Sequence, residues 1–227
     1  MSGESAGSSA FREYERRRAN ELAAIDVQRS RLKERFGGGR IGSAIAAVTV
    51  DDSVKASTHV WKQGAIGEQK VAQVLDGLAG AELIALHDRK LPKSRANVDH
   101  LVVTPSGVWV IDAKRYIGKR PERYQEGGFF SAASVGLKVG GRKRDSLIDG
   151  ILAQVDQVHS VVGENVPVRG ALCFVDSDWP IFGGSFALRG IEVLWPKRLP
   201  KLLKQSSEVK LDVQEIAALL SQKLVPA

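Results

Sequence analysis

The sequence is poor in cysteine and contains no long hydrophobic run. Its single cysteine, Cys173, excludes an internal disulfide and a zinc site built from several cysteines. It lies in the apolar segment Ala-Leu-Cys-Phe-Val, so we expect it in the core. No apolar stretch approaches the about 20 residues that span a bilayer, and the polar N-terminus has no signal-peptide pattern. We therefore expect a cytoplasmic protein that does not cross a membrane.

Several catalytic patterns are missing as well. No Gly-x-Ser-x-Gly elbow and no Cys/His pairing indicates acyl-transfer chemistry. The glycine run at 37–39 is not a phosphate loop, because no Gly-Lys-Ser/Thr follows it. No metal-ligand spacing relates His59, His87 and His159 to one another.

Positive charge, by contrast, is in excess. The chain has 33 Lys and Arg against 26 Asp and Glu, a net charge of +7, which favours a polyanionic partner. Residues 114–144 hold nine basic and two acidic residues, so nine minus two gives this segment alone a charge of +7. Two tyrosines and two phenylalanines (positions 116, 124, 129 and 130) are interleaved with the basic residues and could stack bases. Because the segment adjoins the acidic residues discussed below, we favour nucleic-acid binding over a solvated loop with core aromatics. The predicted contacts are Arg115, Lys119, Arg120, Arg123, Lys138, Arg142, Lys143 and Arg144.

The periodicity predicts an N-terminal region and one α/β domain. Residues 1–57 comprise a polar tail, a charged helix over 11–36 that could self-associate, and a linker; residues 58–227 form the domain. From residue 62 the expected order is helix 62–78, strand 82–86, a hairpin over 98–114, helix 146–162 and strand 168–175. This order, α-β-β-β-α-β, predicts a mixed central sheet flanked by helices. A strand at 191–194 and helices at 197–205 and 213–224 follow the core, with Asp212 as an N-cap.

The hairpin carries one aspartate on each strand. If Thr104 pairs with Gly107 around a two-residue turn, Asp99 lies opposite Asp112, and Lys114 shares the face of Asp112. Like charges placed opposite one another are destabilising, so a bound cation explains this pair better than packing does. A three-residue loop with a bulge would instead place the two aspartates on opposite faces. His100 points away from the aspartates, which favours a structural role.

Two helices contribute polar residues to core-facing stripes. Glu68 shares the stripe of Val71, Leu75 and Leu78, so it either needs a partner or cation or accepts from backbone amides at the helix start. Gln154 lies between Ile151 and Val158 on its stripe, where it could be structural or could orient a water. Carboxylates from several elements are the ligands that Mg²⁺ or Mn²⁺ prefers, and Lys114 could then neutralise charge on a phosphate.

Three segments together resemble the nuclease-related domain (NERD) family of the restriction-endonuclease-like PD-(D/E)xK superfamily. They are Gly-Ala-Ile-Gly-Glu at 64–68, the stretch 98–107, and Val-Ile-Asp-Ala-Lys at 110–114. The resemblance covers about residues 58–165 and extends to the strand at 168–175. It implies a restriction-endonuclease-like core and a metal-dependent nuclease with Glu68, Asp99, Asp112, Lys114 and Gln154 as the catalytic set. Val98 stands in place of the superfamily's proline, and Asp112 in place of this family's usual glutamate, one methylene longer.

The sequence therefore predicts a Mg²⁺- or Mn²⁺-dependent deoxyribonuclease, with Asp99, Asp112 and Glu68 as metal ligands. A catalytically inactive nucleic-acid-binding module of the same fold is the first alternative. A scaffold protein that acts through the 11–36 helix is the second.

Overall fold

The computed structural model describes residues 63–92, 96–127, 134–180, 184–205 and 210–227, together with six single positions between 12 and 27. The chain divides into two compact units, residues 8–65 and residues 66–227 with 1–7. In the first unit, Arg12, Glu15, Arg16, Ala19, Ala23 and Val27 are helical and exposed. These positions agree with the helix predicted for 11–36, whose other residues lie outside the described part, as does the predicted linker before residue 58.

The second unit is built on a six-stranded mixed sheet with the order β1-β2-β3-β7-β9-β8. Its strands are β1 (Ile84–Lys90), β2 (Asn97–Thr104), β3 (Gly107–Arg115), β7 (Val168–Val175), β8 (Phe186–Leu188) and β9 (Ile191–Leu194). Strands β1, β2 and β3 are antiparallel neighbours, whereas β7 is parallel to both β3 and β9. The mixed α/β core with helices on both faces is consistent with a restriction-endonuclease-like core, as predicted.

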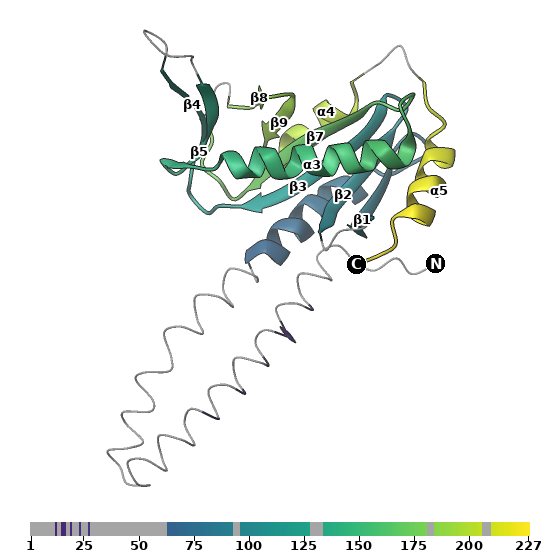
Figure 1. Cartoon of the computed structure of the whole chain (residues 1–227), viewed down its shortest axis with the longest axis horizontal. Helices are drawn as coiled ribbons and strands as arrows, with labels where there is room; N and C mark the ends of the chain where they lie inside the picture. The colour runs from purple at the N-terminus through teal and green to yellow at the C-terminus, as the bar shows by residue number, and fades with distance from the viewer. Residues whose placement is uncertain are drawn as a thin grey trace. The chain divides into compact units, whose positions relative to one another are not determined.

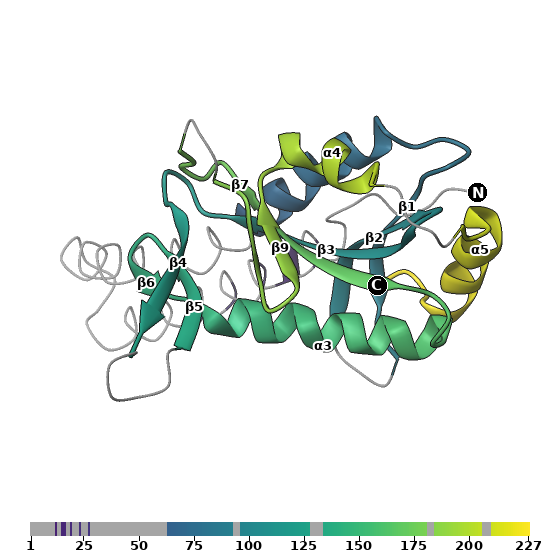
Figure 2. The same cartoon turned by 90° about the horizontal axis from the view of Figure 1, so that it is seen from above.

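Helices cover the two faces of the sheet (Figures 1 and 2). One face packs against α3 (Asp145–Val162) and α5 (Val213–Lys223), which bury Ile151 and Leu220 in a core with Leu101 and Leu172. The opposite face packs against the helix over 63–76 and against α4 (Leu199–Leu203), which follows the 3₁₀ turn η1 (Pro196–Arg198). The alternation of side chains along each strand explains the two cores, because successive residues point to opposite faces.

Most core elements lie where the periodicity predicts them. The strands at 168–175 and 191–194 have the predicted bounds, and Asp212 caps α5 by accepting from the backbone amides of Gln214 and Glu215. Cys173 is buried and free, as expected. No helix in the described part of the chain is both long and apolar enough to cross a bilayer.

Three features of the fold differ from the prediction. Strand β1 continues to Lys90, beyond the predicted strand at 82–86, so Asp88 belongs to the sheet. The basic segment forms a second sheet of β4 (Pro121–Glu126), β5 (Ser134–Val139) and β6 (Arg142–Lys143). The short edge strand β8 was not predicted, because its three residues are too few to show a period of two.

Candidate active site

The β2–β3 hairpin has the two-residue turn and the register that bring its aspartates together. Thr104 pairs with Gly107, and every pair of the ladder out to His100 and Ile111 keeps this register. The next positions outward are Asp99 and Asp112. There the Asp99 carboxylate accepts from the Ala113 backbone amide at 2.9 Å, so a side chain continues the ladder in place of a backbone carbonyl. The three-residue loop is thereby excluded.

Asp112 and Lys114 form an ion pair on the same face of β3. The Lys114 Nζ donates to Asp112 Oδ1, and the Asp112 side chain is only 8% exposed. Burial raises the pKa of Asp112 to about 7; Lys114 opposes this shift, and the adjacent, hydrogen-bonded Asp99 carboxyl adds to it. Burial alone would lower the pKa of Lys114, but Asp112, Asp99 and Glu68 hold it above its ordinary value. Lys114 is therefore a fixed positive charge among carboxyl groups.

Glu68 joins this group from the helix over 63–76. Burial raises its pKa to about 9, followed by repulsion from Asp99 and Asp88, while Lys114 opposes the shift. An isolated helix-start glutamate would be stabilised in its charged form, so the raised pKa argues against that interpretation. The Glu68 carboxyl thus faces the same site as the hairpin aspartates.

Asp88 is a fourth carboxylate that the sequence analysis missed. It is 2% exposed and has a φ of 51°, a left-handed conformation that is uncommon for a residue other than glycine. His87 pairs with His100 and Arg89 with Val98, so Asp88 lies opposite Asp99 across the β1–β2 ladder. Asp88, Asp99 and Asp112 therefore form one row across three adjacent strands.

In the described residues this carboxylate cluster (Glu68, Asp88, Asp99 and Asp112) is not arranged as a ready metal site. Lys114 contacts one oxygen of Asp112, and the Ala113 amide donates to one oxygen of Asp99. Asp88 also accepts from the Asn97 side-chain amide at 3.5 Å and lies near Arg89. When Glu68, Asp99 and Asp112 are all ionised around Lys114, two negative charges (three minus one) remain in a poorly solvated place, which favours either protons or a divalent cation.

Two other predicted residues are placed as follows. Gln154 lies on α3, and its Oε1 is buried without a hydrogen-bond partner in the described part of the chain. No hydrogen bond among the described residues joins it to the carboxylate cluster. His100 is fully buried on the opposite face of β2 and contacts His87 through their Nδ1 atoms at 2.9 Å, in agreement with a structural role.

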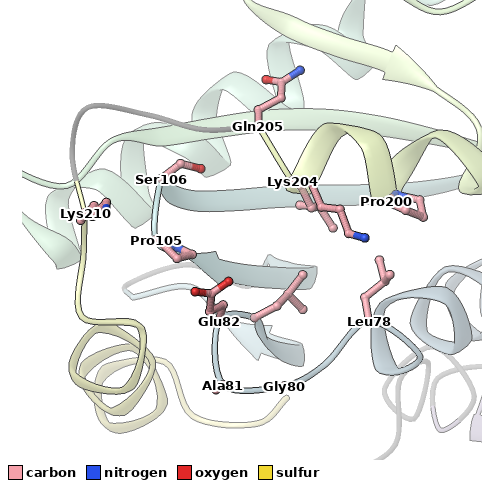
Figure 3. A pocket seen from close by; sticks show the side chains of 12 residues that line it. Leu78, Gly80, Ala81, Glu82, Pro105, Ser106, Pro200, Lys204, Gln205 and Lys210 are labelled. Carbon is pink, nitrogen blue, oxygen red and sulfur yellow. The ribbon is translucent and has the colours of Figure 1, made fainter.

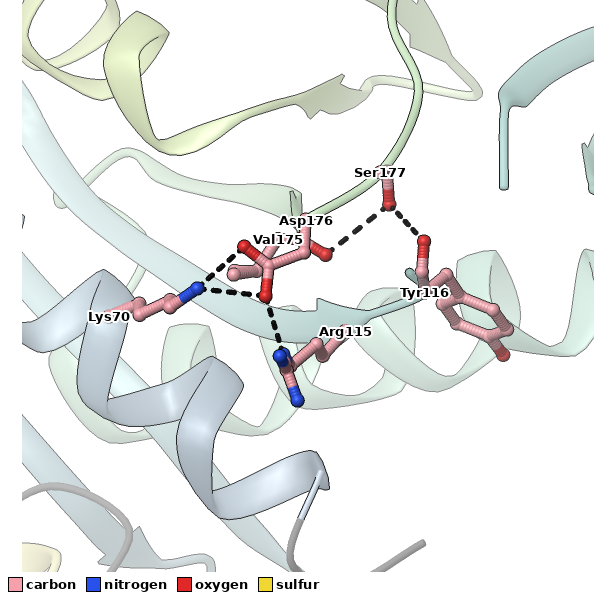
Figure 4. A network of polar contacts seen from close by, with 6 residues as sticks. All are labelled: Lys70, Arg115, Tyr116, Val175, Asp176 and Ser177. Atoms are coloured by element: carbon pink, nitrogen blue, oxygen red, sulfur yellow. Dashed lines mark hydrogen bonds and ion pairs between the residues drawn. The ribbon is translucent and has the colours of Figure 1, made fainter. Parts of the chain in front are cut away.

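Several basic side chains of the 114–144 segment already form ion pairs or hydrogen bonds with other residues of the same chain. Arg115 and Lys70 both bind Asp176 (Figure 4), Arg120 pairs with Asp178, and Arg123 donates to the Ala187 carbonyl. The remaining predicted contacts divide by exposure. Lys119, Arg142 and Lys143 are exposed, Lys143 with a bond to Glu126, whereas Lys138 and Arg144 are half-buried.

The predicted base-stacking role does not fit the described aromatics of this segment. Tyr116 packs against Phe174 with a centroid distance of 5.8 Å. The Tyr124 ring already contacts the ammonium groups of Lys138 and Lys143, 4.8 and 5.0 Å from its centroid. The phenylalanines at 129 and 130 lie outside the described residues.

A cavity of about 610 Å³ lies at the other end of the hairpin (Figure 3). The turn residues Pro105 and Ser106 line it, together with Leu78, Leu83 and Leu203. It contains none of the predicted catalytic residues, so volume alone does not locate the candidate site.

A comparison with protein families decides between the possible identities of this fold. The model of the nuclease-related domain matches residues 63–175. The chain belongs to the nuclease-related domain family. The matched segment runs from the helix over 63–76 to the end of β7, so the NERD domain contains the whole carboxylate cluster, Lys114 and Gln154. No curated protein and no solved structure matches the chain.

Proposed function

We propose that this protein is a metal-dependent nuclease that hydrolyses phosphodiester bonds of DNA in the cytoplasm, with Mg²⁺ or Mn²⁺ as cofactor. The observation that supports the proposal most is the carboxylate cluster, which has four acidic groups and one ammonium inside the NERD domain. Hard divalent cations take oxygen ligands of this kind. The raised pKa values of Glu68 and Asp112 mean that a cation entering the cluster would replace protons and relieve repulsion.

We assign Asp99 and Asp112 as primary ligands and Glu68 as a further ligand, with Asp88 adding negative charge. When bound, the metal would polarise a phosphate oxygen and lower the pKa of a water molecule. Lys114 would turn from Asp112 toward the phosphate and neutralise charge that develops there. Gln154 would orient a water through its free Oε1, and basic residues of the 115–144 segment would hold backbone phosphates.

One observation favours the inactive alternative. The Lys114–Asp112 ion pair partly neutralises the cluster without a metal, as expected of a nuclease fold that only binds nucleic acid. The two proposals differ in what happens to this pair when Mn²⁺ is added. Catalysis requires cation binding at Asp99, whereas binding of nucleic acid alone does not.

Calorimetry and DNA cleavage test the assignment together. We expect Mn²⁺ binding to the wild type that is lost in Asp99→Ala. We expect cleavage of plasmid and linear DNA with Mg²⁺ or Mn²⁺ that falls by about 100-fold or more in Asp112→Asn and in Lys114→Ala. Matched exposed controls, Asp149→Asn and Lys201→Ala, should retain cleavage.

Each result separates the proposals. Cleavage that persists equally in Asp112→Asn and Lys114→Ala would discard the catalytic assignment. Salt-sensitive DNA binding without metal binding or turnover would establish the inactive module instead.

A further inference from the structure

A second cavity, of about 530 Å³, lies at the carboxyl ends of the parallel strands β7 and β9. Its lining comes from the helix over 63–76, from the end of β7 with the turn that follows, and from the β9–η1 junction. In sheets with parallel strands, ligands commonly bind in the crevice at these carboxyl ends. The volume falls within the range of small-ligand sites, about 300–1,000 Å³.

Aromatic rings form one side of this cavity. Trp179 and Trp195 have centroids 4.9 Å apart at an interplanar angle of 44°, and Phe174 meets Trp179 edge-on at 6.5 Å. Both tryptophans are half-buried. The Arg198 guanidinium lies 5.6 Å from the Trp195 ring centroid, so the accessible indole surface is the part that neither Arg198 nor the neighbouring ring covers. The Trp179 Nε1 is enclosed and has no hydrogen-bond partner among the residues described. Because the indole N–H is a donor only, a movement of the Trp179 ring toward the cavity would let it bind a carbonyl or ring-nitrogen acceptor of a planar ligand.

The charges around the cavity favour an anionic ligand. Lys70 binds both oxygens of Asp176 at 2.6 and 2.8 Å, and Arg115 binds the same carboxylate at 2.6 Å (Figure 4). Exposed Lys197 adds a further cation, with no ion pair to any described residue. The charged residues that line the cavity, Lys70, Lys197 and Asp176, have a net charge of +1. Two more cations contact lining residues, Arg115 at Asp176 and Arg198 at Trp195, and this excess of positive charge is suited to a planar base with a phosphate attached.

The cavity is one strand away from the carboxylate cluster. Lys114 of β3 pairs in register with Phe174 of β7, and Phe174 lines the cavity. Adjacent strands lie about 4.8 Å apart, so a nucleic-acid strand with a base in the cavity would pass its backbone beside Lys114.

We propose that this cavity, which we name the Trp179–Trp195 pocket, binds one unstacked base of single-stranded nucleic acid next to the cleavage site. The choice of ligand rests on the proposed nuclease function. The pocket binds the base through stacking on indole and through the Trp179 N–H, and Lys197 contacts a flanking phosphate. Single-stranded or locally opened segments are therefore the preferred substrate of the carboxylate cluster.

Binding in EDTA tests the pocket without cleavage. The probes are a labelled twelve-residue oligothymidylate and an abasic oligomer of the same length, with fluorescence anisotropy and tryptophan quenching as readouts. We expect Trp195→Ala to weaken oligothymidylate binding by about 5- to 100-fold, since each stacked base contributes on this scale. Binding of the abasic oligomer should not change, and Lys201→Ala should bind both oligomers as the wild type does.

If circular dichroism shows that Trp195→Ala does not fold, two measurements replace it. Trp179→Phe keeps the ring packing and removes only the N–H donor, and it should weaken oligothymidylate binding by several-fold. Thymidine 5′-monophosphate should quench the wild-type tryptophan fluorescence. Unchanged binding by Trp179→Phe together with no quenching overturns the proposal.

The remaining outcomes are equally decisive. Equal affinity of the wild type for the thymidylate and abasic oligomers overturns the base pocket, as does the absence of any binding. Quenching by a proline-rich peptide but not by oligothymidylate would assign the indole pair to a protein partner. If DNA cleavage depends on Asp112 but binding does not depend on the base, the pocket proposal is wrong and the nuclease proposal stands. If binding depends on the base but no DNA is cleaved, the nuclease proposal is wrong and the pocket proposal stands.

Discussion

Replacing Glu68 by glutamine should stabilise the metal-free protein at neutral pH. Folding raises the pKa of Glu68 from 4.5 to about 9, chiefly through burial and then through Asp99 and Asp88. When the pKa of a group is higher in the folded than in the unfolded state, the group stabilises the fold at pH values below its unfolded-state pKa. This contribution to the free energy of unfolding is lost as the pH rises toward the folded-state pKa. At pH 7.5, three pH units above 4.5, the penalty has an upper value of about 4 kcal/mol, at 1.36 kcal/mol per unit. Glutamine keeps the shape and has no charge to neutralise.

The measured effect should be smaller than this upper value, because solvent reaches the half-buried side chain. We expect Glu68→Gln to raise the free energy of unfolding by about 1–3 kcal/mol at pH 7.5 in EDTA, as measured by urea denaturation. The same substitution should have almost no effect at pH 4.5, where the carboxyl of the unfolded chain also begins to be protonated. Glu164→Gln, at an exposed position after α3, is the matched control and should be neutral at both pH values.

The sign of the pH dependence is what tests the reasoning. If Glu68→Gln destabilises the protein at pH 7.5, the glutamate is an ionised, satisfied cap, and the electrostatic description of the cluster is wrong. If the stabilisation is equal at pH 4.5 and 7.5, it comes from packing and not from a buried charge. Adding Mn²⁺ should reverse the order of stability, because only the wild type regains a ligand.

Two further predictions concern other buried groups. Burial, followed by repulsion from His87, lowers the pKa of His100 to about 3; its folded form therefore resists the proton that the unfolded chain binds below pH 6.5. As the pH is lowered from 6.5 to 4, the free energy of unfolding of the wild type should fall by about 1 kcal/mol per pH unit relative to that of His100→Asn. The same pH dependence of the free energy of unfolding in both proteins would contradict this. Gly136→Ala would place a Cβ 2.2 Å from an Asp145 oxygen, so it should lower the free energy of unfolding by roughly 1–3 kcal/mol. Gly150→Ala in α3 meets nothing within 4 Å and should be neutral or stabilising; equal effects of the two would refute the steric argument.

The sequence predicts the hairpin and its two aspartates well because strand periodicity and a two-residue turn determine one register. A shift of one residue would move Asp99 and Asp112 to opposite faces, and the observed pairing of Thr104 with Gly107 excludes it. Helix periodicity places Glu68 and Gln154 on core-facing stripes with similar success. Which partners those two side chains meet depends on the packing of whole elements, and periodicity carries no information about that.

The basic segment shows where composition misleads. Its charges suggested a loop open to phosphates, yet several of them are held by Asp176, Asp178 and Glu126, which are distant in sequence or not distinguished by any motif. The aromatic residues that could receive a base lie outside that segment, at Trp179 and Trp195. Each tryptophan is isolated in the sequence, and the parallel pairing of β7 with β9 brings them together, so only the topology reveals the pair.

Asp88 shows why part of the carboxylate cluster escaped prediction. An aspartate before Arg-Lys-Leu-Pro indicates a polar turn, and its positive φ is what a turn residue would have. The strand nevertheless continues past it, with His87 and Arg89 both paired to β2. A buried acid in a strained conformation, opposite another acid, is destabilising in two ways at once. The Asn97 side-chain amide and the nearby Arg89 offset part of this cost, and the proposed cation, shared by the row of aspartates, would offset more of it.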